Sequence, residues 1–374
     1  MKFSEVHGLA DIKKKLLQNF RLNRLAHAQL FLGPEGSGNL AMALALTQLI
    51  YCQDPTEDDS CGVCSSCQKI GKFMHPDVHF SFPSISTSSS KPSISDDFIK
   101  QWRELLTETP YFNENDWVQK ISDNENKQLN ITAKETLEIV KKLSLKAYEG
   151  KAKTLIIWLP EHLRNESNKL LKIIEEPPQK TYFILVASNY DSLLPTITSR
   201  TQLVKIPAYT EVEVADFLGK KYHLDHKKAE SLAFLAEGNL NSATKLVESV
   251  EDNYAQLFRE WMLACYGNKI KDVGRITDDI AKLGRTQIQL FLKNGLKILR
   301  ESLLYKTIDD YEIKFEGEYK DFIRKFSNTI NAQLVEKSYE QINETIYHVQ
   351  RNANAKISLF NLSLGLRQNF IRKK

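Results

Sequence analysis

Three short apolar runs, separated by helical patterns, constrain the fold of the first half of this 374-residue chain. The runs are AQLFL at 28–32, TLIIWL at 154–159 and TYFILVAS at 181–188; a fourth, SRTQLVKI at 199–206, alternates toward its end. Near-continuous apolar strands joined through helices are typical of a parallel sheet covered on both faces. We therefore predict an α/β domain over residues 1–207.

The strand signal ends near residue 207, and the rest of the chain has helical periodicity. Residues 208–250 predict a small helical unit with a break at Gly238–Asn239. Residues 251–374 predict an all-helical domain with amphipathic segments such as IQLFLKNGLKILRESLLY. The chain should therefore divide near residues 207 and 250.

A polar stretch over residues 81–130 interrupts the α/β pattern. It opens with eight serines and two prolines between Ser81 and Ser95, a composition that predicts an exposed loop. Two tryptophans, Trp102 and Trp117, follow within it. We expect them to anchor the stretch to the body of the domain.

Composition excludes several classes of protein. Lys plus Arg is 51 against 47 Asp plus Glu, a formal net charge of +4 that gives no global footprint for nucleic acid. A hydrophobic content of 42% supplies a core and excludes overall disorder. The most apolar run, Leu40–Tyr51, is too short to span a membrane. The first residues carry no apolar signal segment, so we expect a cytoplasmic protein with no membrane partner.

Four of the five cysteines crowd into residues 52–67, with the spacing Cys52-x8-Cys61-x2-Cys64-x2-Cys67. Four thiolates surround one zinc ion tetrahedrally, and the short CxxC loops supply backbone N–H groups to the sulfurs. Such a site leaves no open ligand position, so the pattern predicts structural rather than catalytic zinc. Four free thiols are the alternative, and the distant Cys265 is expected to be a core residue.

A glycine-rich turn, Gly33-Pro-Glu-Gly-Ser-Gly38, lies between the first strand and the next helix, where a phosphate-binding loop belongs. The working pattern continues with Lys, which reaches the phosphates, and Ser or Thr, which holds Mg²⁺. Here Asn39 and Leu40 occupy those positions. The strand at 154–159 also lacks terminal carboxylates for the metal, since its first acid is Glu161. The two losses predict a phosphate-binding loop that no longer binds nucleotide. The alternative, that this is not a nucleotide-binding fold, remains open at this point.

Two other polar groups are predicted to be structural. Glu175 and Glu176 precede Pro177–Pro178, and adjacent carboxylates on a helix point in different directions, so they mark a helix end rather than an acid–base pair. The segment His75-Pro76-Asp77 offers metal ligands beside the cysteines. Four cysteines already complete that site, so this segment is expected to be loop structure.

The segments HAQLFLGPEGSG, the four-cysteine knuckle, NKLLKIIEEPP, FILVASN and TSR follow one another in this order. Together they resemble the bacterial clamp-loader subunits of the AAA+ class, and most closely the delta-prime family of the DNA polymerase III holoenzyme. The resemblance covers residues 1 to about 250. It implies an α/β P-loop (AAA+-type) parallel-sheet domain with an inserted zinc knuckle at 52–67, then a helical lid at 208–250 and an all-α collar domain at 251–374 for oligomerisation.

The resemblance also implies a function. Delta-prime members commonly lack a working ATP site, whereas their tau and gamma relatives keep it, so Asn39 and Leu40 favour the delta-prime type. Ser242 stands where the family ATPases carry a lid arginine. A non-hydrolysing subunit is implied that binds structural zinc but no ATP. It would join tau or gamma and delta subunits in a ring-like pentamer that loads the sliding clamp onto primed DNA. Polymerase activity would belong to another chain of the holoenzyme, and this subunit would be linked to it only by association.

The family retains an arginine for its neighbour in a Ser-Arg-Cys motif, which here is Ser199-Arg200-Thr201. The resemblance implies that Arg200 enters the ATP site of the adjacent subunit. A guanidinium suits that role because it is permanently charged and forks onto two phosphate oxygens. The third position departs from the family, and an ordinary salt-bridged arginine is the alternative.

Two other functions make distinct demands on the sequence. An ATP-hydrolysing tau- or gamma-like subunit needs a lysine near Gly38, but none lies between Lys15 and Lys69. A stand-alone DNA-binding zinc protein needs a basic knuckle, but residues 53–60, QDPTEDDS, are acidic. The delta-prime interpretation meets neither difficulty.

Overall fold

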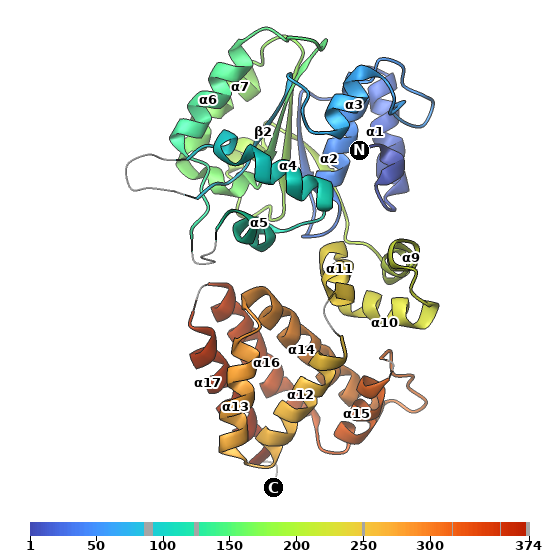
Figure 1. Cartoon of the computed structure of the whole chain (residues 1–374), viewed down its shortest axis with the longest axis vertical. Helices are drawn as coiled ribbons and strands as arrows, with labels where there is room; N and C mark the ends of the chain where they lie inside the picture. Colours follow the sequence, from blue (N-terminus) through green and yellow to red (C-terminus); the bar gives the residue numbers. More distant parts are fainter. Residues whose placement is uncertain (86–92, 123–126, 249–250, 316, 352, 372–374) are drawn as a thin grey trace. The chain divides into compact units, whose positions relative to one another are not determined.

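The structure is a computed structural model that describes residues 1–85, 93–122, 127–248, 251–315, 317–351 and 353–371 (Figure 1). The chain forms two compact units. The first comprises Met1–Glu213 with Gly238–Asn241, and the second comprises Val214–Glu237 with Ser242–Lys374. The three-part division at residues 207 and 250 stays a prediction, because the contacts separate two units.

The first unit is built on a five-stranded sheet in the order β2-β3-β4-β1-β5, in which every neighbouring pair is parallel. The strands are β1 (Ala28–Leu32), β2 (Val78–Ser81), β3 (Lys153–Trp158), β4 (Thr181–Ala187) and β5 (Gln202–Lys205). In the register of the central strands, Leu30 of β1 lies between Leu185 of β4 and Leu203 of β5. The predicted parallel sheet is confirmed, and β2 is a strand that the sequence pattern did not reveal.

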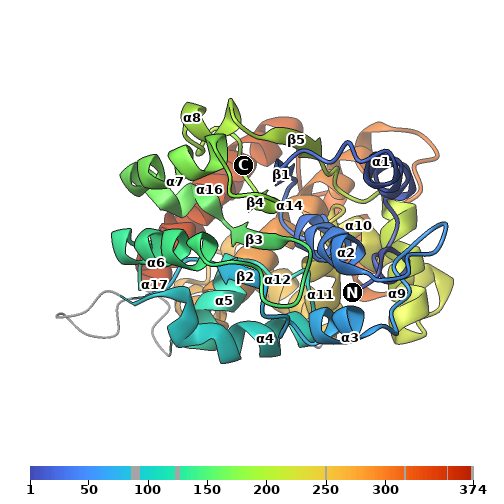
Figure 2. The same cartoon turned by 90° about the horizontal axis from the view of Figure 1, so that it is seen from above.

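Helices cover both faces of this sheet, with α2 on one side and α6 and α7 on the other (Figure 2). The helical elements up to β5 are η1 (Phe3–Glu5), α1 (Ala10–Arg21), α2 (Asn39–Tyr51), α3 (Ser65–Gly71), η2 (Ser95–Phe98), α4 (Ile99–Glu108), α5 (Glu114–Ile121), α6 (Ala133–Ser144), η3 (Pro160–Glu166), α7 (Ser167–Glu175) and α8 (Pro195–Thr198). Helix α2 is buried almost all round, which explains why it is apolar on every side rather than amphipathic. On the opposite face, Leu143 of α6 and Ile174 of α7 pack into one core with Leu185.

The polar stretch at 81–130 differs from the expected loop, because it contains η2, α4 and α5. The physical reason is a buried aromatic cluster. Trp102 and Trp117 are fully buried, with ring centroids 5.4 Å apart, and Phe82 stacks on Trp102 at 4.3 Å. The tryptophans therefore anchor this stretch as expected, and their burial stabilises the helices that carry them.

The serine-rich segment is not an exposed loop where the structure describes it; its central residues 86–92 lie outside the described residues. Ser81, Ser84, Ser93 and Ser95 are all buried. Ser95 donates from its backbone N–H and its hydroxyl to the two carboxylate oxygens of Glu135, at 2.8 Å each. These hydrogen bonds satisfy the buried polar groups of Ser95.

The second unit is helical in its described residues. Its helices, the first and third of which begin in the first unit, are α9 (Glu211–Tyr222), α10 (His226–Ala236), α11 (Leu240–Glu248), α12 (Glu251–Tyr266), α13 (Ile270–Ala281), α14 (Arg285–Thr307), α15 (Glu318–Ser327), α16 (Ala332–Gln350) and α17 (Ala355–Ile371). Cys265 is a buried core residue, as expected. Across the described residues, none of the helices has the length and apolar character needed to traverse a bilayer.

Candidate functional site

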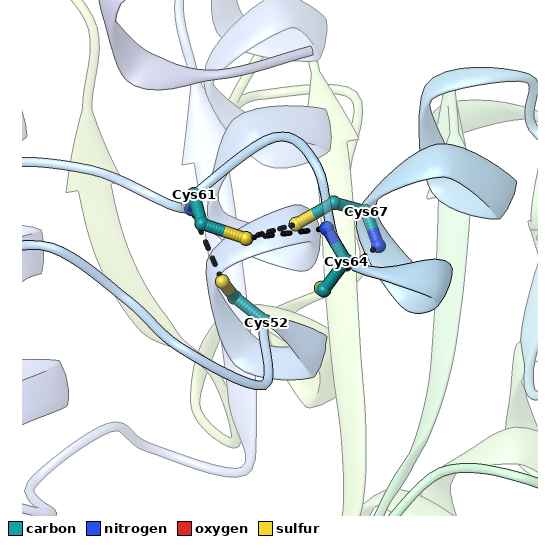
Figure 3. A group of neighbouring side chains, drawn as sticks. All are labelled: Cys52, Cys61, Cys64 and Cys67. Atoms are coloured by element: carbon teal, nitrogen blue, oxygen red, sulfur yellow. Dashed lines mark hydrogen bonds between the residues drawn. The ribbon is translucent and has the colours of Figure 1, made fainter.

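The four clustered cysteines converge in space. Cys52 follows the last residue of α2, Cys61 and Cys64 lie in the next loop, and Cys67 lies in the first turn of α3. Their four sulfur atoms lie within 4.8 Å of one another (Figure 3). Tetrahedral zinc with bonds of about 2.3 Å places sulfurs about 3.8 Å apart, so the group needs only a small contraction around an ion.

Backbone N–H groups donate hydrogen bonds to three of these sulfurs, which favours their thiolate form. Cys61 donates to Sγ of Cys52 at 3.2 Å, Cys64 to Sγ of Cys61 at 3.4 Å, and Cys67 to Sγ of Cys64 at 3.5 Å. The N–H of Cys64 is the largest influence that lowers the pKa of Cys61, to about 6, whereas burial raises the pKa of Cys52 and of Cys67 when no metal is bound. A thiolate is the form that binds metal, so the donor set fits an ion such as zinc.

The cysteine loop also holds the start of the chain. The Asp59 carboxylate accepts the backbone N–H groups of Phe3 at 3.0 Å and Ser4 at 2.8 Å. The amino group of Met1 donates to the side chain of Gln48 in α2 at 2.6 Å. Phe3 is buried, so the loop and the first residues share one packed region.

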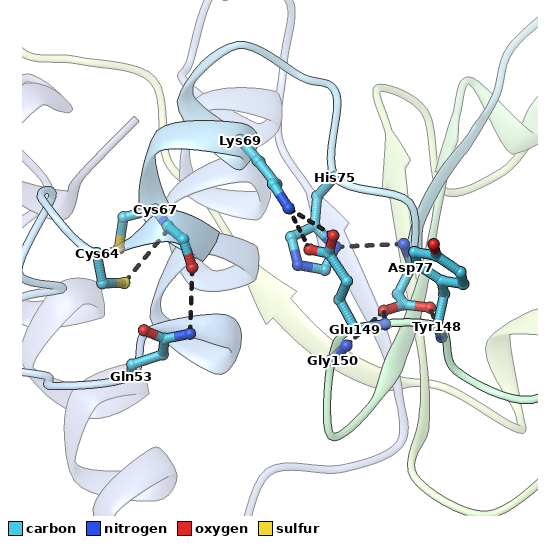
Figure 4. Close-up of polar contacts among 10 residues, drawn as sticks. Gln53, Cys64, Cys67, Lys69, His75, Asp77, Tyr148, Glu149 and Gly150 are labelled. Carbon is cyan, nitrogen blue, oxygen red and sulfur yellow. Dashed lines mark hydrogen bonds and ion pairs between the residues drawn. The ribbon is translucent and has the colours of Figure 1, made fainter.

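Asp77 lies in the loop beside the knuckle, as expected, and backbone groups occupy its carboxylate. Its carboxylate accepts the backbone N–H groups of Tyr148, Glu149 and Gly150 at 2.5, 2.8 and 2.6 Å (Figure 4). Burial opposes its charge, but these bonds hold the pKa of Asp77 below its usual value. The imidazole of His75 accepts the backbone N–H of Asp77 at 3.2 Å, which closes the turn.

The glycine-rich turn joins β1 to α2, as predicted. The side chains of Asn39 and Leu40, which follow it, point into the protein interior. The amide of Asn39 donates to the carbonyls of Gly33 at 3.2 Å and Ala187 at 3.1 Å, and it accepts the N–H of Leu40 at 2.8 Å. Leu40 is buried. Neither side chain offers a positive charge to a phosphate or an oxygen to its Mg²⁺ ion.

The outer side of the turn is covered by protein. Gly36 and Gly38 have φ of +71° and +82°, which favour glycine. A Cβ on Gly36 would lie 2.0 Å from the side-chain oxygen of Asn239, and one on Gly38 would lie 2.5 Å from the Tyr209 hydroxyl. Leu240 also donates to the carbonyl of Gly36 at 3.2 Å. These contacts lie within the first unit.

A cavity of about 420 Å³ lies beside the turn. Glu35, Glu114 and Glu161 line it together with His162, whose imidazole lies 3.4 Å from the Glu114 carboxylate, and its described lining includes neither Lys nor Arg. Burial raises the pKa of Glu161, whose carboxylate accepts the N–H groups of Ser188 at 2.7 Å and Asn189 at 3.0 Å. Without a Lys or Arg in its described lining, the cavity lacks the permanent positive charge that a triphosphate site uses.

The end of β3 belongs to the aromatic cluster rather than to a metal site. Trp158, its last residue, is buried with its ring 5.2 Å from that of Trp102 and 5.1 Å from that of Phe112. Leu159 follows it and is also buried. The position where an ATPase holds its metal-binding carboxylates is thus filled by apolar packing.

Arg200 lies directly after α8 and Ser199 and before β5, on the surface of the first unit. Its Nη1 donates to the carbonyl of Thr196 at 3.0 Å and to the hydroxyl of Ser199 at 3.3 Å, and its Nε pairs with the carboxylate of Glu175. Thr201, the departure from the family motif, donates to the carbonyl of Ile197 at 3.0 Å. It therefore closes the end of α8.

Sequence reasoning missed the partners of these residues. Nothing in the pattern linked Asn39 to Ala187, Gly36 to Asn239 or Arg200 to Glu175, because the partners are far apart along the chain. Gly36 and Gly38 were the sequence signal that could have indicated a contact with the turn, since a glycine in a tight turn often marks a close approach of another segment. Ser242, at the lid-arginine position, lies in α11.

Comparison with known proteins gives three kinds of match. The family model described as "DNA polymerase III, delta subunit" matches residues 8–210. The delta′ subunit of Escherichia coli (strain K12) is 24% identical over 244 residues, which is 64% of this chain and 60% of that protein. The delta′ subunit of Yersinia pestis is 30% identical over 190 residues, or 50% of this chain and 43% of that protein.

The matches extend to other subunits of the same polymerase. The tau subunit of Bacillus subtilis (strain 168) is 22% identical over 368 residues, or 92% of this chain and 57% of that protein. A solved gamma-subunit-related protein of Thermotoga maritima is 14% identical and covers 95% of this chain and 99% of that one, with a TM-score of 0.43. The chain spans at most about three fifths of the length of the curated relatives named here.

The parallel sheet, the glycine-rich turn between β1 and α2, and the helices on both faces define a P-loop α/β protein of the AAA+ type. The family match covers more than half of the chain. The chain belongs to the DNA polymerase III delta subunit family, and the relatives it is similar to include subunits named delta′.

Proposed function

We propose that this chain is a non-hydrolysing subunit of a replicative clamp loader. It joins tau or gamma and delta subunits, and the assembly loads a sliding clamp onto primed DNA. The chain contributes a rigid domain and a trans-acting arginine rather than an ATP site of its own. A cytoplasmic location follows from that role.

The observation that carries the proposal is the bonding of Asn39. In a working loop the corresponding lysine reaches outward to the phosphates, whereas this amide bridges two backbone carbonyls at the ends of β1 and β4. The cavity beside it has neither Lys nor Arg in its described lining, and the end of β3 is apolar; both agree with the proposal, because nucleotide phosphates need positive charge and a metal ligand.

Arg200 is the residue proposed to act on a neighbour. It is a permanent charge on the surface of the first unit, and Ser199 helps to orient it through the hydrogen bond to Nη1. In an assembled ring it would stabilise the charge that develops on the transferring phosphoryl group of the adjacent ATPase.

The metal is proposed to be structural zinc held by Cys52, Cys61, Cys64 and Cys67. Four thiolates complete the coordination, so the ion would supply a cross-link between α2, the following loop and α3. Residues 208–250 are proposed as the lid and residues 251–374 as the oligomerisation collar.

The test is the ATPase activity of the reconstituted loader in the presence of clamp and primed DNA. Arg200→Ala should lower turnover at least about tenfold without loss of assembly, because a trans-acting arginine stabilises transition-state charge. The matched control is Arg21→Ala, which removes an exposed arginine of the same unit and should leave turnover unchanged. An unchanged rate with Arg200→Ala would reduce the role to scaffolding.

The alternative, an ATP-hydrolysing tau- or gamma-like subunit, is tested on the chain alone. Calorimetric titration with ATP and Mg²⁺ should detect no binding at micromolar concentrations. Micromolar affinity would favour that alternative, since it would require phosphate ligands that Asn39 and Leu40 do not supply.

A further inference from the structure

We infer that Glu175 is a positioning residue for Arg200, one that holds the guanidinium in the orientation in which it serves a neighbouring subunit. The inference rests on the proposed trans-acting role of Arg200. It adds a specific partner for that arginine, and it assigns a function to a carboxylate that the sequence marked only as a helix end.

The first step is the pattern of bonds around the guanidinium. Nε pairs with Glu175, and Nη1 donates to Thr196 and Ser199. Nη2 has no bonded partner among the described residues. Three bonds therefore fix the plane of the group, and Nη2 remains as the donor for an external oxygen. A guanidinium fixed by several of its five N–H groups loses little further freedom when it binds phosphate.

The second step is the rigidity of the two backbones. Glu175 is the last residue of α7, and Ile174 beside it is buried. Arg200 follows α8, where Ile197 is buried, and both isoleucines belong to the same core. The carbonyl of Ile174 also contacts the imidazole of His27 at 2.9 Å. The ion pair thus joins two anchored helix ends rather than two mobile loops.

The third step is exposure. The side chain of Arg200 is 32% exposed and that of Glu175 is 46% exposed. Ion pairs this open to water contribute little to fold stability, so the pair serves orientation more than folding. A change at Glu175 is therefore expected to leave the chain folded, which makes the inference testable in the complete assembly.

The opposite role for Glu175 is a latch that neutralises Arg200 and must open before the arginine can act. The two roles predict opposite effects of Glu175→Ala. Loss of a positioning residue lowers the turnover of the neighbouring ATPase, whereas loss of a latch raises it. The bonds to Thr196 and Ser199 favour positioning, because a latch would not need them to hold the plane.

The experiment measures kcat and KM for ATP in the reconstituted loader with clamp and primed DNA. Glu175→Ala should lower kcat about three- to fivefold with KM little changed, since misorientation affects the transition state more than binding. Glu175→Gln should stay within about twofold of wild type, because its side-chain oxygen still accepts the Nε–H. Glu176→Ala, the adjacent exposed carboxylate, is the matched control and should have no effect.

The double variant decides whether Glu175 acts through Arg200. Glu175→Ala should cause no further loss in the Arg200→Ala background, since a positioning residue has nothing left to orient. An unchanged or raised kcat with Glu175→Ala overturns the inference, and so does an additive loss in the double variant. If Arg200→Ala itself has no effect, the trans-acting role fails and the inference fails with it. If Arg200→Ala lowers kcat but Glu175→Ala does not, the inference about Glu175 fails while the proposed role of Arg200 stands.

Discussion

The side-chain amide of Asn39 donates a hydrogen bond to the carbonyl of Ala187, 148 residues along the chain, at 3.1 Å. It also donates to the carbonyl of Gly33 at 3.2 Å. The residue that departs from the phosphate-loop pattern has therefore become a cross-link between the carboxyl ends of β1 and β4. The position that has lost the phosphate-binding lysine has thus gained a structural contact.

Asn39→Ala should destabilise the chain by about 1 kcal/mol, the usual net value of such hydrogen bonds. The cost stays modest because the carbonyl of Ala187 keeps the N–H of Gly33 at 3.2 Å. Urea unfolding measures the change. Gln179→Ala, an exposed surface change, is the control and should leave the free energy of unfolding within about 0.5 kcal/mol. Equal effects of the two variants would contradict the cross-link.

Removal of the metal ligand Cys64 should abolish stoichiometric zinc and destabilise the first unit. Metal analysis should find one zinc per wild-type chain and none with Cys64→Ser. The free energy of unfolding should fall by more than about 2 kcal/mol, as expected when a structural metal is lost. Cys265→Ala is the control, because it changes a buried cysteine of the second unit and should retain the zinc. A wild-type chain without zinc would refute the proposed metal centre.

Asp77 should make stability depend on pH. Its pKa is lowered in the folded state, so its contribution is present above the unfolded pKa of about 3.9 and is lost as pH falls through the folded pKa. Asp77→Asn should therefore cost about 1–3 kcal/mol near neutral pH and less in acid below about pH 3. Urea unfolding at both pH values tests the difference.

The control for Asp77 is Glu149, in the loop whose N–H groups the Asp77 carboxylate accepts. Glu149 forms an exposed ion pair with Lys69 at 2.5 Å, so Glu149→Gln should cost less than about 1 kcal/mol. A loss with Asp77→Asn that is the same at both pH values would show that the charge of Asp77 is not what the three N–H groups recognise.

Gly36→Ala should be strongly destabilising, by about 1–3 kcal/mol, because φ is +71° and the new Cβ would meet the Asn239 side chain. Asn239→Ala in the same chain should recover the part due to the clash but not the part due to φ. Gly274→Ala is the control: its Cβ meets nothing within 4 Å, and alanine is the better helix former. Thermal unfolding distinguishes these outcomes, and a harmless Gly36→Ala would contradict the packing of Asn239 on the turn.

Local patterns in the sequence were sufficient for the elements that depend on neighbouring residues. The strand predicted at 28–32 is β1 with the same bounds, and the helix expected after the glycine-rich turn is α2. The four cysteines also lie close together along the chain, so their spacing alone predicted that they meet. In each case the physical cause, whether apolar periodicity or a short loop, acts within about 16 residues.

Two features escaped the local pattern because other segments create them. The strand β2, VHFS, is short and half polar, and it is a strand because it pairs with β3. The described residues 95–108 and 114–121 form helices because Trp102 and Trp117 bury themselves beside Phe82 and Trp158. Burial of aromatic rings outweighs a composition that by itself favours a loop.

The sequence by itself determined the α/β class, the glycine-rich turn without its lysine, the cysteine cluster and the arginine after α8. Tertiary structure alone decided what each of these residues contacts. Asn39 meets Ala187, Gly36 meets Asn239, and Arg200 meets Glu175 only after the sheet and its helices have packed. Hydrogen bonds and ion pairs act over a few ångströms, so their partners depend on the folded path of the chain and not on distance along it.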